Sequence, residues 1–217
     1  MSLDGSIAGP NQSVENPLGE GGDHLHDWLF KLKTFRAIHG DMSGGETGTN
    51  DDVLREAFEN IGATIMGRNM FGGGHGPWGE PPWKGWWGDN PPFHQPVFIL
   101  THFAREPFPM QGGTTFFFVT EGIESALKQA RHAAGEKDVA LGGGANVALQ
   151  YLAAGLIDEL EIHVVPVLLG SGTRLFDNFD YPNVKLEPIR AIAGPGVTHL
   201  KYRVLKGANS NQPKKGT

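Results

Sequence analysis

Three consecutive glycines stand where a predicted strand gives way to a predicted helix, in the segment Leu141-Gly142-Gly143-Gly144-Ala145-Asn146. Glycines remove the side chains that would keep a ligand from the backbone, and the helix N-terminus beyond them offers unpaired N–H groups to a pyrophosphate. A tight strand-to-helix turn with positive φ would select the same glycines. The segment therefore predicts either an anion-binding turn or a purely structural one.

Two further predicted strands end in polar or charged residues, in Met66-Gly67-Arg68-Asn69 and in Leu100-Thr101-His102. Ligands of open α/β sheets bind beyond the carboxyl ends of the strands, so Arg68 can pair there with a ribose 2′-phosphate, supported by Thr101 and His102 as donors. Such pairing would select NADPH over NADH. The alternative is that Arg68 is an ordinary solvated charge.

A carboxylate lies beside the apolar stripe of the first predicted helix, in Leu25-His26-Asp27-Trp28. Asp27 can face a cleft there as a carboxyl of raised pKa that relays a proton, or it can be a solvated acid in the first helical turn. His24 and His26 are two residues apart, where side chains diverge, so we expect no metal site.

The elements that position these residues follow from the spacing of apolar side chains. Helical spacing predicts a helix from His24 to Ile38 and a second helix that begins at Thr49 or Asn50 and stops at Gly62. Short apolar runs predict strands at 63–66, 97–101, 116–120, 138–141 and 160–169, with helices at 123–134 and 145–154. A terminal antiparallel pair is expected at 184–192 and 197–205.

Alternating strands and helices followed by a hairpin predict an α/β fold, with a mostly parallel sheet, helices on both faces and an antiparallel edge. Between Gly72 and Pro96 runs a long connection rich in tryptophan. Its four tryptophans would either cap a substrate cleft or pack into a dimer interface: Trp78, Trp83, Trp86 and Trp87.

Composition limits the possible function classes. The 217 residues suit one domain, which we expect over 1–206, followed by a disordered polar tail at 207–217. The absence of cysteine excludes disulfides, a thiol nucleophile and thiolate metal sites. A net charge of −6 argues against a nucleic-acid surface. Because neither a signal peptide nor a membrane-spanning stretch is visible, we expect a cytoplasmic protein that binds no membrane.

The ordered blocks Ile65-Met66-Gly67-Arg68, Leu100-Thr101 and Gly142-Gly143-Gly144 resemble the cofactor-binding set of dihydrofolate reductase. The segment 2–9 is similar to the substrate-side segment of the reductase (C-terminal) domain of bifunctional riboflavin-biosynthesis deaminase-reductases, as is the run 158–176. The blocks together cover most of the chain from Met1 to Leu205.

The resemblance implies a dihydrofolate-reductase-like three-layer α/β/α fold and hydride transfer from C4 of NADPH to a C=N or C=O carbon. It implies a homodimer formed through the sheet edge. It places Asp4 and the first helix beside the substrate, with Asp27 as the nearest candidate for the buried carboxylate that relays a proton in dihydrofolate reductases. The cofactor-binding residues it implies are Gly67, Arg68, Asn69, Thr101, His102 and Gly142 to Asn146.

Our leading hypothesis is an NADPH-dependent reductase of a small heterocycle, either pterin-like or pyrimidine-like. The second is a 5-amino-6-(5-phosphoribosylamino)uracil reductase of riboflavin biosynthesis, which needs a basic residue near Asp4 to hold the substrate phosphate. The sequence around Asp4 offers none, and Leu141 stands where these reductases usually have a substrate-contacting Glu. The third is a non-catalytic nucleotide-binding module.

Members of these families have a central strand before the segment that begins at Ser2. A gap within a sheet would leave backbone groups unpaired. We therefore expect either a different start or another strand that fills the slot.

Overall fold

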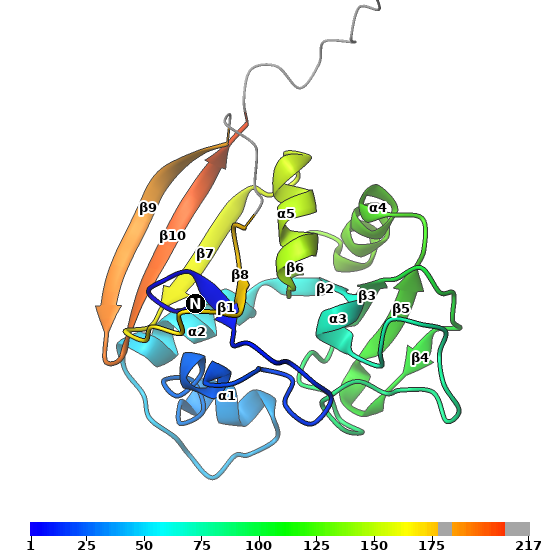
Figure 1. Cartoon of the computed structure of the whole chain (residues 1–217), viewed down its shortest axis with the longest axis horizontal. Coiled ribbons are helices and arrows are strands. Elements are labelled where there is room, and N and C mark those ends of the chain that lie inside the picture. Colours follow the sequence, from blue (N-terminus) through cyan, green and yellow to red (C-terminus); the bar gives the residue numbers. More distant parts are fainter. Residues whose placement is uncertain (178–183, 207–217) are drawn as a thin grey trace, which may run out of the picture.

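The computed structural model describes residues 1–177 and 184–206, whose strands form a five-stranded, a three-stranded and a two-stranded sheet with helices packed against them (Figure 1). The predicted three-layer α/β/α class is confirmed. The expected polar tail at 207–217 lies outside the described residues. The helices of four or more residues are α1 (Lys33–Ile38), α2 (Thr49–Glu59), α3 (Arg68–Phe71), α4 (Ile123–Ala134), α5 (Ala145–Ala153) and the 3₁₀-helix η1 (Gly22–Leu25).

The larger sheet has five strands in the order β4-β5-β3-β2-β6, and only β4 is antiparallel to its neighbour. These strands are β2 (Ile61–Gly67), β3 (Pro96–Leu100), β4 (Phe108–Pro109), β5 (Thr115–Val119) and β6 (Asp138–Leu141). The predicted short apolar strands are confirmed. Such runs form parallel strands because helices or loops cover both faces of the sheet.

A helix covers one face of this sheet, and a long loop covers the other. On one face, Ala126 and Ala130 of α4 are fully buried against Ala63 and Ile65 of β2. Alanine at these positions lets the helix approach the strands closely. The other face is covered by residues 72–95, which we call the Trp-rich segment. Fully buried Phe71 of α3 and buried side chains of β2, β3 and β5 pack against this segment.

The smaller sheet is antiparallel, in the order β7 (Glu159–Val164), β10 (Val197–Leu205), β9 (Lys185–Gly194). The predicted hairpin is confirmed, and Gly196 in its turn has φ +75°. The predicted strand to Leu169 is too long. β7 stops before Pro166, which has no N–H to donate, and Val165 pairs instead with Ser2.

A gap separates the two sheets. β6 pairs with β2 and β7 pairs with β10, and the other edge of β7 meets only Met1 and Ser2, so no strand in the described ranges joins β6 to β7. The N-terminal strand β1 (Ser6–Ala8) pairs elsewhere, with β8 (Thr173–Arg174). The expectation of another strand in the slot is therefore wrong for the described residues.

The predicted helix from His24 to Ile38 is wrong as a continuous element. Only η1 and α1 are helical, because the backbone of Lys31 and Lys33 forms hydrogen bonds with Glu46 and is extended at Leu32. The apolar stripe nevertheless identifies buried residues, since Leu25 and Leu32 pack with Trp28 in the core beside the smaller sheet.

The second predicted helix is correct in place but too long. It ends at Glu59, and Ile61 and Gly62 begin β2. Gly62 reflects close packing rather than a helix stop, because a Cβ there would lie 2.9 Å from the Cα of Ala134 on α4.

Two histidines face each other across β7 and β10. Asn50 donates its amide N–H to the carbonyl of Pro195, so its oxygen accepts from Nε2 of His199 at 3.1 Å. Nδ1 of His199 then accepts from Nδ1 of His163 at 2.8 Å. Trp28 packs against both rings. This chain of donors holds both imidazoles neutral, and burial lowers the pKa of His163 to about 4.

Acidification should therefore destabilise the protein. The pKa of His163 is about 6.5 in the unfolded chain and about 4 in the folded chain. Between these two pH values the unfolded chain binds a proton that the folded chain does not bind. The free energy of unfolding therefore decreases as the pH falls from about 6.5 to about 4. The loss should be on the order of 3 kcal/mol. Urea unfolding at about pH 7.5 and about pH 4.5 measures it.

His163→Gln, which keeps a donor toward His199, should flatten this pH dependence, whereas His132→Gln at an exposed position on α4 should leave it unchanged. Equal pH dependence in the wild type and His163→Gln would contradict the assignment.

Candidate functional site

The carboxyl ends of four neighbouring strands lie side by side at one edge of the larger sheet. In register, Gly67 pairs with Leu100, Ile65 with Leu141 and Leu100 with Val119. The strand ends expected to converge are thus brought together, because parallel strands in register end at the same edge. The predicted site segments at these ends are 67–69, which begins with the last residue of β2, 101–102 and 142–146.

The glycine turn after β6 is fastened to the end of β2. The N–H of Gly142 donates to the carbonyl of Ile65, and the N–H of Gly67 donates to the carbonyl of Gly143, both at 2.8 Å. Gly143 has φ +110°, a conformation that a side chain would strain. The structural role expected for the glycines is therefore present at Gly143.

The same turn leaves open space in front of α5. A Cβ built on Gly144 would have no neighbour within 4 Å, and Gly144 is the N-cap of the helix. The first amides of a helix have no acceptor within it. Asn146 is exposed in this first turn and accepts a hydrogen bond from Gln150. The edge therefore offers room and N–H donors to an anionic group.

Gly67 determines how closely α5 approaches β2. A Cβ at this position would lie 2.7 Å from Cγ2 of Val147, well inside contact distance. The absence of a side chain at Gly67 thus positions the N-terminus of α5 against the end of the strand.

Gly67→Ala should destabilise the protein by about 1–3 kcal/mol, because the added methyl group overpacks this contact. Val147→Ala should relieve the clash, so the double variant should be more stable than the sum of the two single effects. Urea unfolding of the four proteins completes the cycle. Gly79→Ala is the control, since a Cβ there meets nothing; strict additivity would contradict the contact.

Arg68 is fastened to the loop that follows it. Its Nε donates to the carbonyl of Gly72 at 3.0 Å and its Nη2 to that of Gly73 at 2.7 Å. The guanidinium carbon lies 3.2 Å from the ring centre of Trp78, while Nη1 is buried without a partner. Burial and nearby Arg105 lower the Arg68 pKa. A guanidinium stays charged near neutral pH, so Arg68 can face an anion with one free group.

The other predicted donors differ in exposure. Thr101 is buried, and its hydroxyl accepts the N–H of Phe103 at 3.2 Å, which shapes the turn after β3. Asn69 and His102 are exposed at the same edge. Binding by these residues remains a prediction.

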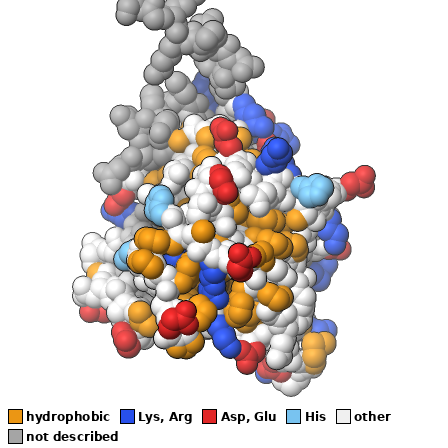
Figure 2. Space-filling model, turned by 90° about the vertical axis from the view of Figure 1, so that its right-hand side faces the viewer, with side chains coloured by type: hydrophobic (Ala, Val, Ile, Leu, Met, Phe, Trp, Pro, Cys, Tyr) orange, Lys and Arg blue, Asp and Glu red, His pale blue; other side chains and the backbone are white. Residues whose placement is uncertain are grey.

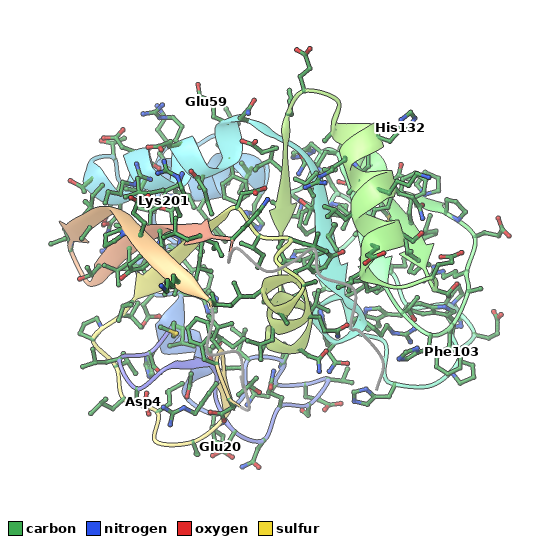
Figure 3. All side chains as sticks on the ribbon, turned by 90° about the horizontal axis from the view of Figure 1, so that it is seen from above. Asp4, Glu20, Glu59, Phe103, His132 and Lys201 are labelled. Atoms are coloured by element: carbon green, nitrogen blue, oxygen red, sulfur yellow. The ribbon has the colours of Figure 1, made fainter. Side chains whose placement is uncertain are left out.

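Asp4 lies elsewhere, far from Phe103 in the view from above (Figure 3). Its carboxylate accepts hydrogen bonds from Ser2 Oγ at 2.6 Å and from the N–H of Gly170 at 2.8 Å. These bonds lower the pKa of Asp4 to about 2. Asp4 is therefore ionised near neutral pH and serves as an acceptor, not as a proton donor.

Asp27 is not a buried carboxyl. Its side chain is 64% exposed and pairs with Nδ1 of His24 at 3.0 Å. The solvated alternative describes it correctly, because Asp27 lies in the turn between η1 and α1 and not on a continuous helix. In the described ranges, no three His, Cys, Asp or Glu side chains are arranged to hold a metal ion.

Sequence analysis missed a second cation beside Arg68. The Arg105 guanidinium lies 5.1 Å from the ring centre of Trp78 and 4.8 Å from that of Phe118. Its Nη1 donates to the carbonyl of Trp83 at 2.6 Å. The available signal was the position of Arg105, four residues after Thr101 at a strand end.

The Trp-rich segment covers the second face of the sheet. Trp78 donates its ring N–H to the carbonyl of Phe103, Trp83 to that of Phe71 and Trp86 to that of Met70. On the side of the molecule that carries β4 and β5, apolar side chains reach the surface with basic side chains among them (Figure 2). The segment therefore serves first as cover for the sheet.

A basic residue also lies near Asp4. Arg174 of β8 pairs with Ser6, and its Nη2 would be 3.6 Å from a Cβ at Gly5. The sequence around Asp4 offers no basic residue, but β8 brings Arg174 beside this segment from far along the chain. Arg174 is half-exposed and pairs with Asp177 at 3.4 Å.

No helix in the described ranges has the length and apolar character needed to cross a membrane.

Residues 1–199 match the family model described as the RibD C-terminal domain. No protein with a curated description matches the chain. Among solved structures, a Shewanella sp. PV-4 protein named for riboflavin biosynthesis is 21% identical with a TM-score of 0.60, over 95% of this chain and 96% of that one.

Two other similar structures belong to longer proteins. A Thermotoga maritima diaminohydroxyphosphoribosylaminopyrimidine deaminase/5-amino-6-(5-phosphoribosylamino)uracil reductase is 13% identical with a TM-score of 0.56, over 94% of this chain and 54% of that one. Acinetobacter baumannii RibD is 16% identical with a TM-score of 0.51, over 94% of this chain and 55% of that one. The chain thus spans about half the length of these two proteins.

Proposed function

Because the chain belongs to the family of RibD C-terminal domains, we propose that it is an NADPH-dependent reductase of a small heterocyclic substrate, either pterin-like or pyrimidine-like. The observation that carries the proposal is the edge where β2, β3 and β6 end. There the glycine turn leaves open space before the N-terminus of α5, and a guanidinium retains an unpartnered group.

The residues at this edge fit a dinucleotide. The first amides of α5 would donate to the pyrophosphate, and Arg68, Thr101 and His102 would lie toward the 2′-phosphate. When bound, NADPH supplies the hydride carried on C4 of its nicotinamide ring. The contribution of the protein is to orient the two reactants.

Reduction of a C=N bond adds a hydride to carbon and a proton to nitrogen. Asp4, with its pKa of about 2, would accept a hydrogen bond from the substrate but not deliver that proton near neutral pH. Asp27 is open to water, so a proton that passes through it would come from bulk solvent.

Titration with NADPH and NADH, followed by tryptophan fluorescence, tests the cofactor, since Trp78 stacks on Arg68. We expect NADPH to bind more tightly than NADH. Oxidation of NADPH in the presence of pterin, pyrimidine and imine substrates then tests turnover. Binding without oxidation of any of them would favour a non-catalytic nucleotide-binding module, and no binding would refute the proposal.

Asn146→Asp should weaken NADPH binding about tenfold, because it puts a negative charge beside the pyrophosphate. The helix itself should not lose stability, since an acidic residue in the first turn suits the helix dipole. Gln129→Glu on α4 is the control with the same charge change. Equal NADPH affinity in Asn146→Asp and wild type, measured by calorimetry, would remove α5 from the cofactor site.

The second candidate is 5-amino-6-(5-phosphoribosylamino)uracil reductase, and Arg174 beside Gly5 favours it. Arg174 would hold the substrate phosphate, which the sequence around Asp4 cannot. Leu141 in place of the expected Glu is the observation against it.

Arg174→Gln should raise KM for the phosphorylated pyrimidine about tenfold, because a charge-assisted hydrogen bond to the phosphate is lost. KM for the dephosphorylated pyrimidine should not change. Arg203→Gln, at an exposed ion pair on β10, serves as control. A wild-type enzyme that reduces both pyrimidines with the same KM would exclude this role of Arg174.

A further inference from the structure

Arg68 and Arg105 are two cations without a counter-charge. In the described ranges neither forms an ion pair, whereas five other arginines do: Arg36, Arg55, Arg174, Arg190 and Arg203. The chain carries a net charge of −6, so carboxylates are abundant. Arg131, exposed on α4, also forms no ion pair with any described residue, so Arg68 and Arg105 are set apart by being partly buried against one aromatic ring.

Both guanidiniums are held against one aromatic ring. Their central carbons lie 3.2 Å and 5.1 Å from the ring centre of Trp78. Burial lowers the pKa of each, and Arg105 lowers that of Arg68 further by repulsion. Cation–π contacts offset part of this repulsion. An anion between the two would offset more of it, because opposite charges attract strongly where water is partly excluded.

Each guanidinium retains donors. Among the described residues, Arg68 donates from Nε to Gly72 and from Nη2 to Gly73 and Gly76, while its buried Nη1 has no partner. Within the part of the chain that the structure describes, Arg105 donates from Nη1 alone, to the carbonyl of Trp83.

The pair lies beside the strand ends that form the proposed cofactor site. Arg68 follows directly on Gly67 of β2, and Arg105 packs over Phe118, the residue before the end of β5. Trp78 is tied by its ring N–H to Phe103, just beyond the end of β3. The glycine turn follows β6, on the other side of β2.

We infer that Arg105 acts with Arg68 and Trp78 to bind a phosphomonoester dianion, the 2′-phosphate of the nucleotide. This inference rests on the proposed function and adds a specificity-determining residue to it. The substrate phosphate is the other source of the same chemistry. Its basic neighbour is Arg174, which lies beside Gly5 and not at these strand ends.

Calorimetry with adenosine 2′,5′-bisphosphate, adenosine 5′-diphosphate and ribose 5-phosphate tests the inference. Arg105→Gln should weaken binding of the bisphosphate about tenfold to 100-fold, as expected for a lost charge-assisted hydrogen bond, and change binding of the diphosphate less than about twofold. Arg105→Lys should restore part of the affinity. Arg131→Gln, exposed on α4, is the matched control.

Equal losses for the bisphosphate and the diphosphate would overturn the inference, and so would a lower melting temperature of Arg105→Gln with unchanged affinities. A loss confined to ribose 5-phosphate would move the site to the substrate and also overturn it. Failure of the reductase proposal looks different: the wild type would bind neither NADPH nor NADH, while Arg105-dependent binding of the bisphosphate would persist.

Discussion

Backbone pairing around the carboxyl end of β2 is the constraint on which the candidate site depends. β2 is bonded to β3 on one side and β6 on the other, and the amide of Gly67 continues this pairing into the glycine turn. Because Gly67 has no side chain, Val147 of α5 can pack directly against the end of β2. Three elements are thus fixed relative to one another before any ligand contributes.

Local patterns predicted most of the larger sheet. The strands of that sheet are short apolar runs, and α4 carries buried residues at helical spacing between clear ends, so each sequence pattern corresponds to one structure. The same reasoning failed between His24 and Ile38. There the apolar stripe is real, but the backbone pairs with Glu46, a contact distant enough in sequence that periodicity cannot reveal it.

Some residues of the candidate site could likewise be predicted from local sequence, and others could not. The glycine turn and Arg68 could be found because strand ends in a parallel sheet share one edge, which makes local segments converge. For Arg105 the sequence offered only its position four residues after Thr101, and for Arg174 it offered nothing, since each gains its neighbours through a loop or a strand pairing that local sequence does not reveal. The alternative that Asp27 is a buried carboxyl is wrong, because it depended on a continuous helix that the structure interrupts.

The gap between β6 and β7 affects how the molecule responds to partial unfolding. No ladder of main-chain bonds crosses between the two sheets in the described ranges, and each sheet has its own apolar cluster. Amides in such ladders exchange with solvent only when their cooperative unit opens. The two sheets can therefore open as separate cooperative units, with different protection of their amides from deuterium exchange.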